Sequence, residues 1–495
     1  MTEKLTDQEL SRRKKMEDLR AKGIDPFGHA FKRTSDTQTI NRLYGDKDQA
    51  ALGQLAAKVV IAGRIMTKRA MGKIGFMHLQ DRYGQIQVLC KKDQMGEDNF
   101  ALYKAADLGD IVGIAGTVFR TDSGELSVLA DEYTHLAKAL RPLPEKFHGL
   151  TDKEERFRRR YLDLITNDKA RQIAFARPRI IRAIQHYFDG QGLVEVETPV
   201  LQPILGGANA RPFITHHNAL DRDFYLRIAT ELELKRLIVG GMEGVYEIGR
   251  IFRNEGMDTM HNPEFTTVEA YIAYSDLQGM MDTMEALLES VANEVNGTTE
   301  LTYQGIPISL KGPYKRLHMV DAVKQYAGVD FWSVTSDQQA VELAAQHGIK
   351  LEAHEQTYGH VIDKFFGQFC EDKLIQPTFV YGHPLDISPL AKKDDKDPRF
   401  TQRFELFING HEYCNAFSEL NDPLDQRERF ENQIKEKNKG NAEAAEMDVD
   451  YVEALEYGLA PTGGLGLGVD RLVMLLTDAD TIREVLLFPT MKPLD

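Results

Sequence analysis

Short runs in which apolar and polar residues alternate fill the segment from Lys58 to about Leu140. Alternation with a period of two is typical of strands that bury one face and expose the other. Five such runs, divided by turn residues, lie at 59–66, 75–80, 85–90, 111–118 and 126–130. Because several short strands in so small a segment can close on themselves, this pattern predicts a β-barrel.

The predicted barrel has the strand number of the oligonucleotide-binding (OB) fold. Its strand faces carry a mixture of basic, aromatic and amide side chains, namely Arg64, Lys68, Phe76 and Gln87. Aromatic rings stack on unpaired bases, while amide and basic groups bond to base edges and phosphates. The barrel is therefore a candidate for binding single-stranded nucleic acid, and a barrel without such a ligand is the alternative.

The rest of the chain divides around this barrel. Residues 1–55 are predicted as a helical extension that becomes irregular from Gly23 onward, where Gly and Pro interrupt it. The barrel domain occupies 56–143, and a linker or hinge follows at 144–165. In 166–495, helices mix with long antiparallel strand signals rather than with a regular βαβ alternation. This mixture predicts an α+β domain on an antiparallel sheet.

Composition narrows the class of protein. The 495 residues carry a net charge of −15 and are 42% hydrophobic, which suits a large core and argues against a surface that binds nucleic acid everywhere. No run approaches the ~20 apolar residues that span a bilayer, so we expect no membrane contact. Three cysteines are too few for a disulfide framework, and the first residues lack a signal-peptide core. We therefore expect a cytoplasmic protein.

One stretch, residues 250–271, combines the residue types that suit a nucleotide. We predict two strands, 251–255 and 264–271, joined by a loop. Side chains alternate along a strand, so one face of the first strand would carry Arg253 and Glu255. One face of the second would carry Phe265, Thr267, Glu269 and Tyr271. Such a hairpin offers a guanidinium for phosphate, a ring for a base and carboxylates for amines, with an ordinary charged hairpin as the alternative.

Two further segments complete a set of motifs. Residues 463–476 place Arg471 after a Gly-x-Gly-x-Gly run, which is a weak signal by itself. Residues 192–201 form a short predicted strand that ends at Pro199. Taken in chain order, the segments 192–201, 250–271 and 463–476 resemble the three signature motifs of class II aminoacyl-tRNA synthetases. Over nearly the whole chain, the sequence is most similar to the bacterial lysyl-tRNA synthetases of subclass IIb, through 206–213, 230–235 and 415–422.

This resemblance implies an OB-fold anticodon-binding domain followed by a class II synthetase catalytic domain. Arg253 would bind the α-phosphate and the substrate carboxylate, and Arg471 would cover the face of adenine opposite Phe265. These two arginines are the expected catalytic residues. Met260 stands where many relatives carry a further arginine. The remaining expected ATP-binding residues are Glu255, His261 and Asn262, although the His-Asn-Pro sequence also favours a simple turn.

Two carboxylates flank the strongest hairpin signal in the chain, Asn409-Gly410. With a two-residue turn, Glu405 would face Cys414 and lie diagonal to Glu412 on the same face. Close carboxylates repel each other unless a cation lies between them, so the pair predicts a site for Mg²⁺ bound to ATP, with a solvated pair as the alternative. A straight strand would point Asn415 away from Glu412. We therefore expect a bulge or bend between them, or a longer loop.

The choice of amino acid depends on carboxylates that meet an ammonium group. Thr230 and Glu233 have the spacing of a helix-capping box, which would leave Glu231 free in the first helical turn. A favourable interaction of Glu231 with the helix dipole is the alternative. The resemblance implies a lysine pocket formed by Gly207, Glu231, Glu269, Tyr271, Asn415, Phe417 and Glu419.

The resemblance thus implies an enzyme that uses ATP and Mg²⁺ to join lysine to tRNA, and a homodimer in which the segment ending at Pro199 lies at the interface. The barrel residues named above would bind the tRNA anticodon. A first alternative is an aspartyl- or asparaginyl-tRNA synthetase of the same subclass, but the presence of Glu231 and Glu419 argues against it. A second is a tRNA-binding protein without catalysis, but the presence of Arg253 and Arg471 argues against it.

Overall fold

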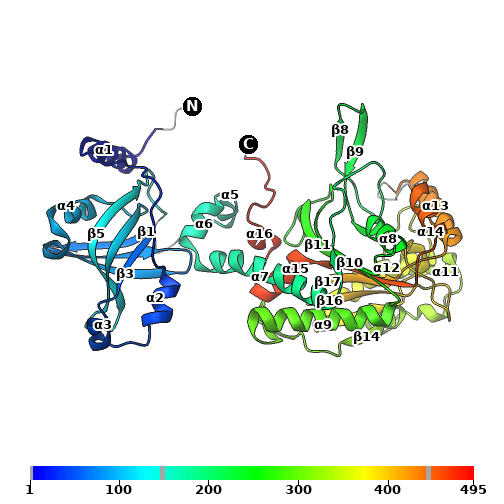
Figure 1. Ribbon diagram of the computed structural model, residues 1–495. Helices are drawn as coiled ribbons and strands as arrows, with labels where there is room; N and C mark the ends of the chain where they lie inside the picture. The colour runs from blue at the N-terminus through cyan, green and yellow to red at the C-terminus, as the bar shows by residue number, and fades with distance from the viewer. Residues whose placement is uncertain (1–3, 145–149, 151, 442–446, 495) are drawn as a thin grey trace. The chain divides into compact units, whose positions relative to one another are not determined.

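The computed structural model describes residues 4–144, 150, 152–441 and 447–494. The chain forms two compact units, Met1–Thr151 and Asp152–Asp495 (Figure 1). Part of the predicted linker, 145–149 and 151, lies outside the described residues. Within the described parts of the chain, no helix has the length and apolar character needed to cross a membrane.

Three helices precede the barrel in the N-terminal unit: α1 (Asp7–Ala21), α2 (Thr37–Tyr44) and α3 (Gln49–Leu55). Helix α1 begins at a capping box, in which Thr6 and Glu9 each bond to the backbone N–H of the other. The Arg12 guanidinium of α1 donates to the carbonyl groups of Leu108 and Ala139. Part of the basic charge of α1 is therefore used to hold the helix in place.

The five predicted strands are present and form a closed barrel in the order β1-β2-β3-β5-β4, which confirms the fold predicted for this unit. Alternate residues point inward, and Ile61, Met77 and Val88 among them are buried in the core. The elements of the barrel are β1 (Lys58–Met71), β2 (Ile74–Gln80), β3 (Gln85–Lys91), α4 (Lys92–Ala105), β4 (Ile111–Arg120) and β5 (Leu126–Ala137).

The larger unit is built on an eight-stranded sheet in the order β14-β15-β16-β17-β18-β11-β10-β6. The central strands from β15 to β10 are antiparallel, as predicted, whereas the edge pairs β14/β15 and β10/β6 are parallel. The strands are β6 (Val194–Glu195), β10 (Gly244–Phe252), β11 (Glu264–Ala273), β14 (Lys315–His318), β15 (Thr378–Tyr381), β16 (Arg403–Ile408), β17 (His411–Ser418) and β18 (Thr462–Gly468).

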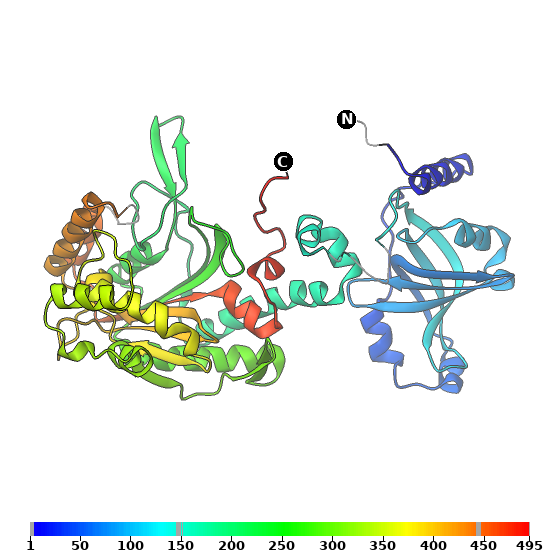
Figure 2. The ribbon, with the colours of Figure 1, turned by 180° about the vertical axis from the view of Figure 1, so that it is seen from behind.

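Two small sheets accompany the large one. The first joins β7 (Leu201–Gln202), β9 (Arg222–Leu226) and β8 (Ile214–His217), and its β8–β9 hairpin projects from the larger unit (Figures 1 and 2). The second is a pair of strands, β12 (Glu300–Tyr303) and β13 (Ile306–Ser309).

Helices α7 (Asp168–Gly190), α9 (Leu277–Asn296) and α15 (Val469–Thr477) share one hydrophobic core with the large sheet. Residues of the predicted linker form α5 (Lys153–Arg158) and α6 (Arg160–Thr166). The buried Arg160 explains this order, because it pairs with Asp163 at 2.7 Å and donates to the Leu487 carbonyl. The other helices are α8 (Glu231–Val239), α10 (Met319–Ala327), α11 (Asp337–Gln346), α12 (Tyr358–Phe369), α13 (Pro423–Asn438), α14 (Val449–Glu456) and α16 (Ile482–Val485).

The hairpin predicted at 250–271 is present, but its first strand ends earlier than predicted. Strand β10 stops at Phe252, so Arg253 and Glu255 lie in the loop and not on a strand face. The Arg253 N–H still donates to the Pro263 carbonyl, but the ladder ends there because Pro263 has no N–H to donate back. The alternation predicted for β11 holds along its whole length.

The β16–β17 hairpin turns at Asn409 and Gly410, whose φ values of 51° and 74° suit a two-residue turn. The predicted bulge between Glu412 and Asn415 is confirmed. Leu406 pairs with Cys414 and Phe407 with Glu412, so Tyr413 has no opposite residue. Glu405 consequently faces Asn415 and not Cys414, as the straight hairpin would require.

Candidate active site

The sheet carries a cavity of about 480 Å³ on the face opposite its helical core. Strand β11 shows how one strand serves both sides. Val268 and Ala270 are buried in the core, while Glu269 and Tyr271 line the cavity. The structure brings these predicted residues together at the cavity wall: Gly207, Glu231, Arg253, Glu255, His261, Asn262, Phe265, Glu269, Tyr271, Glu405, Glu412, Asn415, Phe417 and Arg471.

The glycine run before Arg471 is strand β18, which forms the floor of this cavity. A Cβ atom on Gly464 would collide with the Glu419 carboxylate and the Tyr271 ring. Glycine is therefore required where the floor passes beneath these side chains. Glycine spacing alone carried no such information, because the contacts come from Tyr271 on β11 and from Glu419, just after β17.

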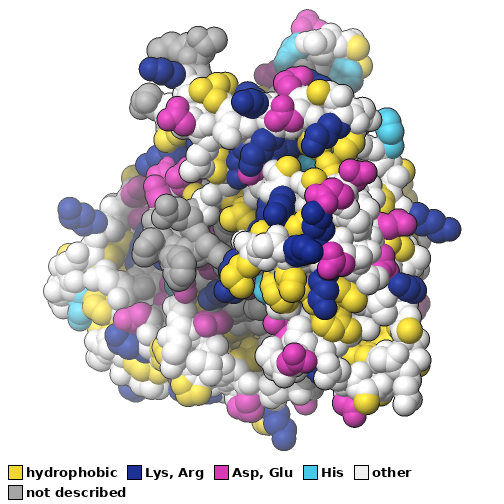
Figure 3. Space-filling view, turned by 90° about the vertical axis from the view of Figure 1, so that its left-hand side faces the viewer, with side chains coloured by type: hydrophobic (Ala, Val, Ile, Leu, Met, Phe, Trp, Pro, Cys, Tyr) yellow, Lys and Arg dark blue, Asp and Glu magenta, His cyan; other side chains and the backbone are white. Residues whose placement is uncertain are grey.

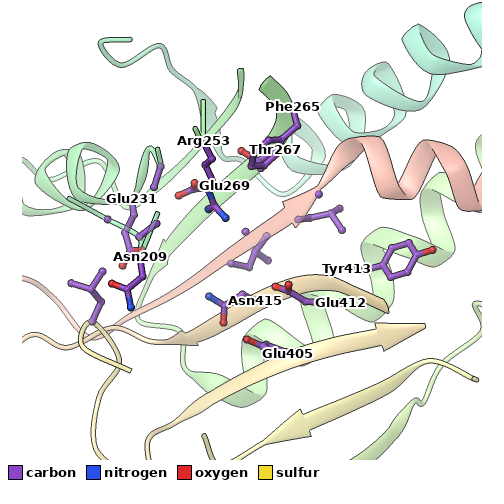
Figure 4. A pocket seen from close by; sticks show the side chains of 18 of the residues that line it. Asn209, Glu231, Arg253, Phe265, Thr267, Glu269, Glu405, Glu412, Tyr413 and Asn415 are labelled. Carbon is purple, nitrogen blue, oxygen red and sulfur yellow. The ribbon is translucent and has the colours of Figure 1, made fainter. Parts of the chain in front are cut away.

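The bulge at Tyr413 decides which side chains of β17 enter the cavity. Figure 4 shows Glu412 and Asn415 directed into the cavity, whereas the Tyr413 ring points away from it. The Tyr413 side chain is buried in the hydrophobic core. One extra residue thus reconciles the two carboxylates of the hairpin turn with the polar residues farther along the strand.

Arginines and an aromatic ring line one part of the cavity. The Arg253 guanidinium carbon lies 5.3 Å from the centre of the Phe265 ring. The Arg471 guanidinium donates to the Glu412 carbonyl, and its Nη2 lies 3.1 Å from Nε2 of His261. The other ring nitrogen of His261 contacts Asp258 at 2.8 Å. His261 therefore links the β10–β11 loop to Arg471.

Two predicted loop residues contribute to structure. The Asn262 amide donates to the Glu264 carbonyl at 2.7 Å and accepts a hydrogen bond from the Thr490 N–H. Met260 lines the cavity and packs against the hydrophobic core.

The carboxylates of Glu405 and Glu412 face the same part of the cavity (Figure 4). Glu405 contacts Arg403 at 2.7 Å and His383 at 3.4 Å. Burial favours the protonated acid, but His383 and Arg403 lower the pKa of Glu405 to about 2. Burial and the charge of Glu405 raise the pKa of Glu412. The pair therefore offers one carboxylate held ionised and a second whose ionised form a nearby cation would favour.

These two carboxylates fit a divalent cation with few protein ligands. No cluster of three His, Cys, Asp or Glu side chains suited to a metal occurs within the described residues. Mg²⁺ typically takes one or two carboxylates and completes its shell with water and substrate phosphates. Glu405 and Glu412 match that requirement.

An anionic pocket lies near the N-terminus of α8. The Tyr271 hydroxyl donates to Glu269 at 3.1 Å, and the Thr230 N–H donates to the same carboxylate at 3.3 Å. Burial, together with the nearby charge of Glu231, raises the pKa of Glu269 to about 7. A ligand ammonium entering this pocket would relieve that unfavourable charge.

The prediction of a capping box at the start of α8 is wrong, and so is the prediction that Glu231 has no partner. The Thr230 side chain makes no capping bond, and Glu233 instead lies 3.7 Å from Arg236. Glu231 pairs with Lys235 one helical turn later, at 2.6 Å. The i,i+4 spacing of Glu231 and Lys235 is the signal in the sequence that indicates this pair.

Glu419 does not line the cavity wall with the other predicted residues. It is buried directly behind the wall, where its carboxylate forms an ion pair with Lys235. The collision expected for a Cβ on Gly464 shows that Glu419 lies immediately under the floor. The residues missed by the sequence analysis are therefore charged partners: Lys235, His383 and Arg403.

The barrel brings two of its four predicted residues together. Phe76 and His78 are two residues apart on β2 and therefore share its outer face, and Gln87 on β3 lies opposite His78. Lys68 does not join them, because it lies opposite the buried Met77. Its ammonium donates to the carbonyl groups of Lys104 and Ala106, and burial lowers its pKa to about 8. Arg64 is half-buried and donates to the Gly109 carbonyl.

A largely antiparallel eight-stranded sheet with an arginine-lined cavity, together with an OB barrel, has the architecture of a class II aminoacyl-tRNA synthetase. Residues 152–492 match the family of class II tRNA synthetases (D, K and N), and 59–136 match the OB-fold nucleic acid binding domain. The chain belongs to this class II family.

Full-length relatives agree with this assignment. The chain is 60% identical over 493 residues to the lysine–tRNA ligase of Listeria monocytogenes, covering 100% of this chain and 99% of the relative. It is 59% identical over 490 residues to the lysine–tRNA ligases of Lactococcus lactis and Streptococcus sanguinis, covering 99% of each chain.

Proposed function

We propose that this protein is a lysine–tRNA ligase. In the first step, a carboxylate oxygen of L-lysine attacks the α-phosphorus of ATP, the bond to the bridging oxygen breaks, and pyrophosphate leaves. In the second step, the lysyl group passes from the adenylate to the 3′-terminal adenosine of tRNA, and AMP leaves. The observation that carries the proposal is that one cavity contains both an anionic pocket and a part lined by arginines.

The first step needs alignment and charge stabilisation rather than a general base, because the attacking carboxylate is already ionised at neutral pH. Arg253 is proposed to hold this carboxylate and the α-phosphate. The ring of Phe265 and the guanidinium of Arg471 would enclose the adenine, and Glu255 would accept from its amino group. His261 would contact the distal phosphates, while Asn262 holds the loop.

Selection of lysine follows from the anionic pocket. Glu231 and Glu269 line it with the Tyr271 hydroxyl, Asn415 and Phe417, and Gly207 leaves room at its rim. An amino acid without a second ammonium would leave the buried Glu269 with no cation beside it, at a cost of roughly 1–3 kcal/mol. Aspartate would need a cation in this anionic pocket, but the cation beside it, Lys235, is directed at Glu231 and Glu419.

Mg²⁺ is the proposed cofactor, held by Glu405 and Glu412 together with phosphate oxygens of ATP. When bound, it would neutralise the charge that builds up on the phosphates as pyrophosphate leaves. Arg403 would keep Glu405 ionised and oriented, since it already bonds to that carboxylate.

The barrel is proposed to read the tRNA anticodon through Phe76, which is 36% exposed, and Gln87. Arg64 would contribute at the rim of this face, and Lys68 is left out because its ammonium is already bonded. Lys and Arg side chains lie among Asp and Glu side chains on the face shown in Figure 3. This mixture suits local contacts to tRNA rather than binding over the whole surface.

A homodimer is proposed from the edge of the large sheet. Strand β6 forms this edge, and Pro199 follows it closely. Large apolar side chains are exposed in this strand and in the segment that follows it: Val194, Val200 and Leu201. Apolar surface around an edge strand is typical of an interface between subunits. The cytoplasm is the proposed location, consistent with three buried, free cysteines.

The function is tested by ATP–pyrophosphate exchange with each of the twenty amino acids. We expect exchange with lysine, dependent on Mg²⁺ and independent of tRNA. Exchange with aspartate or asparagine in place of lysine would contradict the proposal. Absence of exchange with all amino acids, from protein that binds tRNA, would favour a non-catalytic tRNA-binding protein.

The metal assignment is tested with the double variant Glu405→Gln/Glu412→Gln. We expect exchange to fall roughly a hundredfold or more, because a bound cation supplies several kcal/mol of charge stabilisation. Glu371→Gln is the matched control, since Glu371 lies near Glu405 but outside the cavity wall. Near-normal exchange in the double variant, or an equal loss in the control, would remove Glu405 and Glu412 as metal ligands.

Phe76→Ala tests the barrel. Loss of base stacking, worth roughly 1–3 kcal/mol, should raise the KM for tRNA about 5- to 100-fold while lysine activation stays unchanged. Phe76→Tyr keeps the aromatic surface and should behave like the wild type. If exchange and tRNA charging fall together in Phe76→Ala, the barrel does not act as an independent recognition module.

Light scattering tests the homodimer. At micromolar concentration we expect twice the chain mass of 56.0 kDa. Leu201→Asp should shift the protein toward single chains, because it places a charge on the exposed apolar edge. Tyr457→Asp is the control, since Tyr457 is 81% exposed on another part of the unit. A fully active wild-type species of single-chain mass would contradict the proposal.

A further inference from the structure

A cluster of three bonded side chains lies beside the proposed nucleotide site and joins three elements of the larger unit. Arg177 on α7 donates through Nη1 to one carboxylate oxygen of Asp470 on α15, and through Nη2 to the Thr266 hydroxyl on β11 at 3.0 Å. The other carboxylate oxygen of Asp470 accepts the Thr266 N–H at 2.7 Å. Each of the three residues therefore bonds to both of the others.

The bond from the Thr266 N–H to Asp470 takes the place of a strand pairing. The pairing of β11 with β18 ends at Thr267 and Gly468, so the Thr266 N–H has no strand residue opposite it on that side. A buried N–H needs an acceptor, and the carboxylate in the first turn of α15 supplies it. Asp470 is 2% exposed and Thr266 is 9% exposed, so the protein interior, and not water, supplies their partners.

The cluster is adjacent in sequence to the two side chains that are proposed to enclose adenine. The bonded Thr266 N–H belongs to the peptide unit that follows Phe265, and Asp470 immediately precedes Arg471. Phe265 and Arg471 both line the cavity. Because Phe265 is on β11 and Arg471 is on α15, the bond between their neighbours fixes how far apart these two elements lie at the cavity.

We propose that Arg177, Thr266 and Asp470 are positioning residues that set the width of the slot between Phe265 and Arg471, and thereby the affinity for the adenine of ATP. This inference rests on the proposed function. The polar groups of the three residues are bonded to one another. Their role is to hold in place the two side chains that meet the base.

The geometry of Arg177 explains why a guanidinium is used here. Its planar group presents two N–H donors at a fixed angle, so it holds the Asp470 carboxylate and the Thr266 hydroxyl in one arrangement. A lysine ammonium could neutralise Asp470 but has no rigid fork. A favourable interaction of Asp470 with the N-terminus of α15 would need neither Arg177 nor Thr266. The double contact therefore indicates alignment of β11 with α15.

The test compares Thr266→Val, Thr266→Ser and Arg177→Lys with the wild type by pyrophosphate exchange. Valine keeps the shape of threonine and the backbone N–H but removes the hydroxyl, and lysine keeps the charge of Arg177 but removes the fork. We expect the KM for ATP to rise roughly tenfold in Thr266→Val and Arg177→Lys, the effect of losing one hydrogen bond to a charged group. Thr266→Ser keeps the hydroxyl and should retain the wild-type KM for ATP. The KM for lysine should not change in any of the three.

Competitive inhibition of exchange separates the slot from the rest of the nucleotide site. Adenosine presents the base without phosphates, and tripolyphosphate presents phosphates without the base. In Thr266→Val and Arg177→Lys, we expect the inhibition constant of adenosine to rise roughly tenfold, as the KM for ATP does, while that of tripolyphosphate stays unchanged. Arg179→Lys is the matched control, because Arg179 lies on the same helix and donates to the Val295 carbonyl at 3.0 Å. Its constants should equal those of the wild type.

The double variant Arg177→Lys/Thr266→Val guards against a general fold defect. Both single changes remove the same bond from Nη2 of Arg177, so the double variant should raise the KM for ATP by about the same factor as either change alone. A wild-type KM for ATP in both single variants, or a rise in the double variant equal to the product of the single rises, would overturn the inference. So would a parallel rise in the constants for tripolyphosphate or lysine. Wild-type protein without lysine-dependent exchange would instead overturn the proposed function.

Discussion

Acidic side chains gathered in one cavity need cations or hydrogen-bond donors beside them, since a buried carboxylate without partners is costly. The larger unit meets this need in two places. Arg403 and His383 stabilise Glu405, and Lys235 stabilises Glu231 and Glu419. Glu269 and Glu412 keep raised pKa values, although Arg471 lies 3.6 Å from Glu412. They lie where the proposed lysine and Mg²⁺ would supply further positive charge.

The sheet allows this charge to be buried because its two faces are chemically separate. On β11, Val268 and Ala270 join the apolar core while Glu269 and Tyr271 face the cavity. On β17, the same separation needs the unpaired Tyr413, whose ring remains in the core. Strand β18 contributes no large side chain at Gly464, which leaves space for the Glu419 carboxylate beneath the floor.

Local patterns predicted the features that depend on neighbours in sequence. The barrel, the alternation along β11 and the Asn409-Gly410 turn follow from period and turn chemistry. The bulge at Tyr413 followed from a conflict between a straight strand and the family motif. Features that depend on distant partners were missed. The end of β10 at Phe252 reflects its pairing with Pro263, which has no N–H to continue the ladder, and the orientation of Lys68 depends on carbonyl groups at the end of α4. Parallel pairing at the sheet edges has no local signature.

The capping-box error at Thr230 shows the same limit in the candidate site. The spacing of Thr230 and Glu233 is correct for a cap, but the Thr230 N–H bonds to Glu269 on β11. This cross-element bond places the start of α8 against the anionic pocket. The helix N-terminus carries a partial positive charge, which favours carboxylates beside it. The start of α8, which supplies Glu231, therefore also contributes positive potential that favours the carboxylates of the pocket. In a capping box, the Thr230 N–H would bond to Glu233 and not to Glu269.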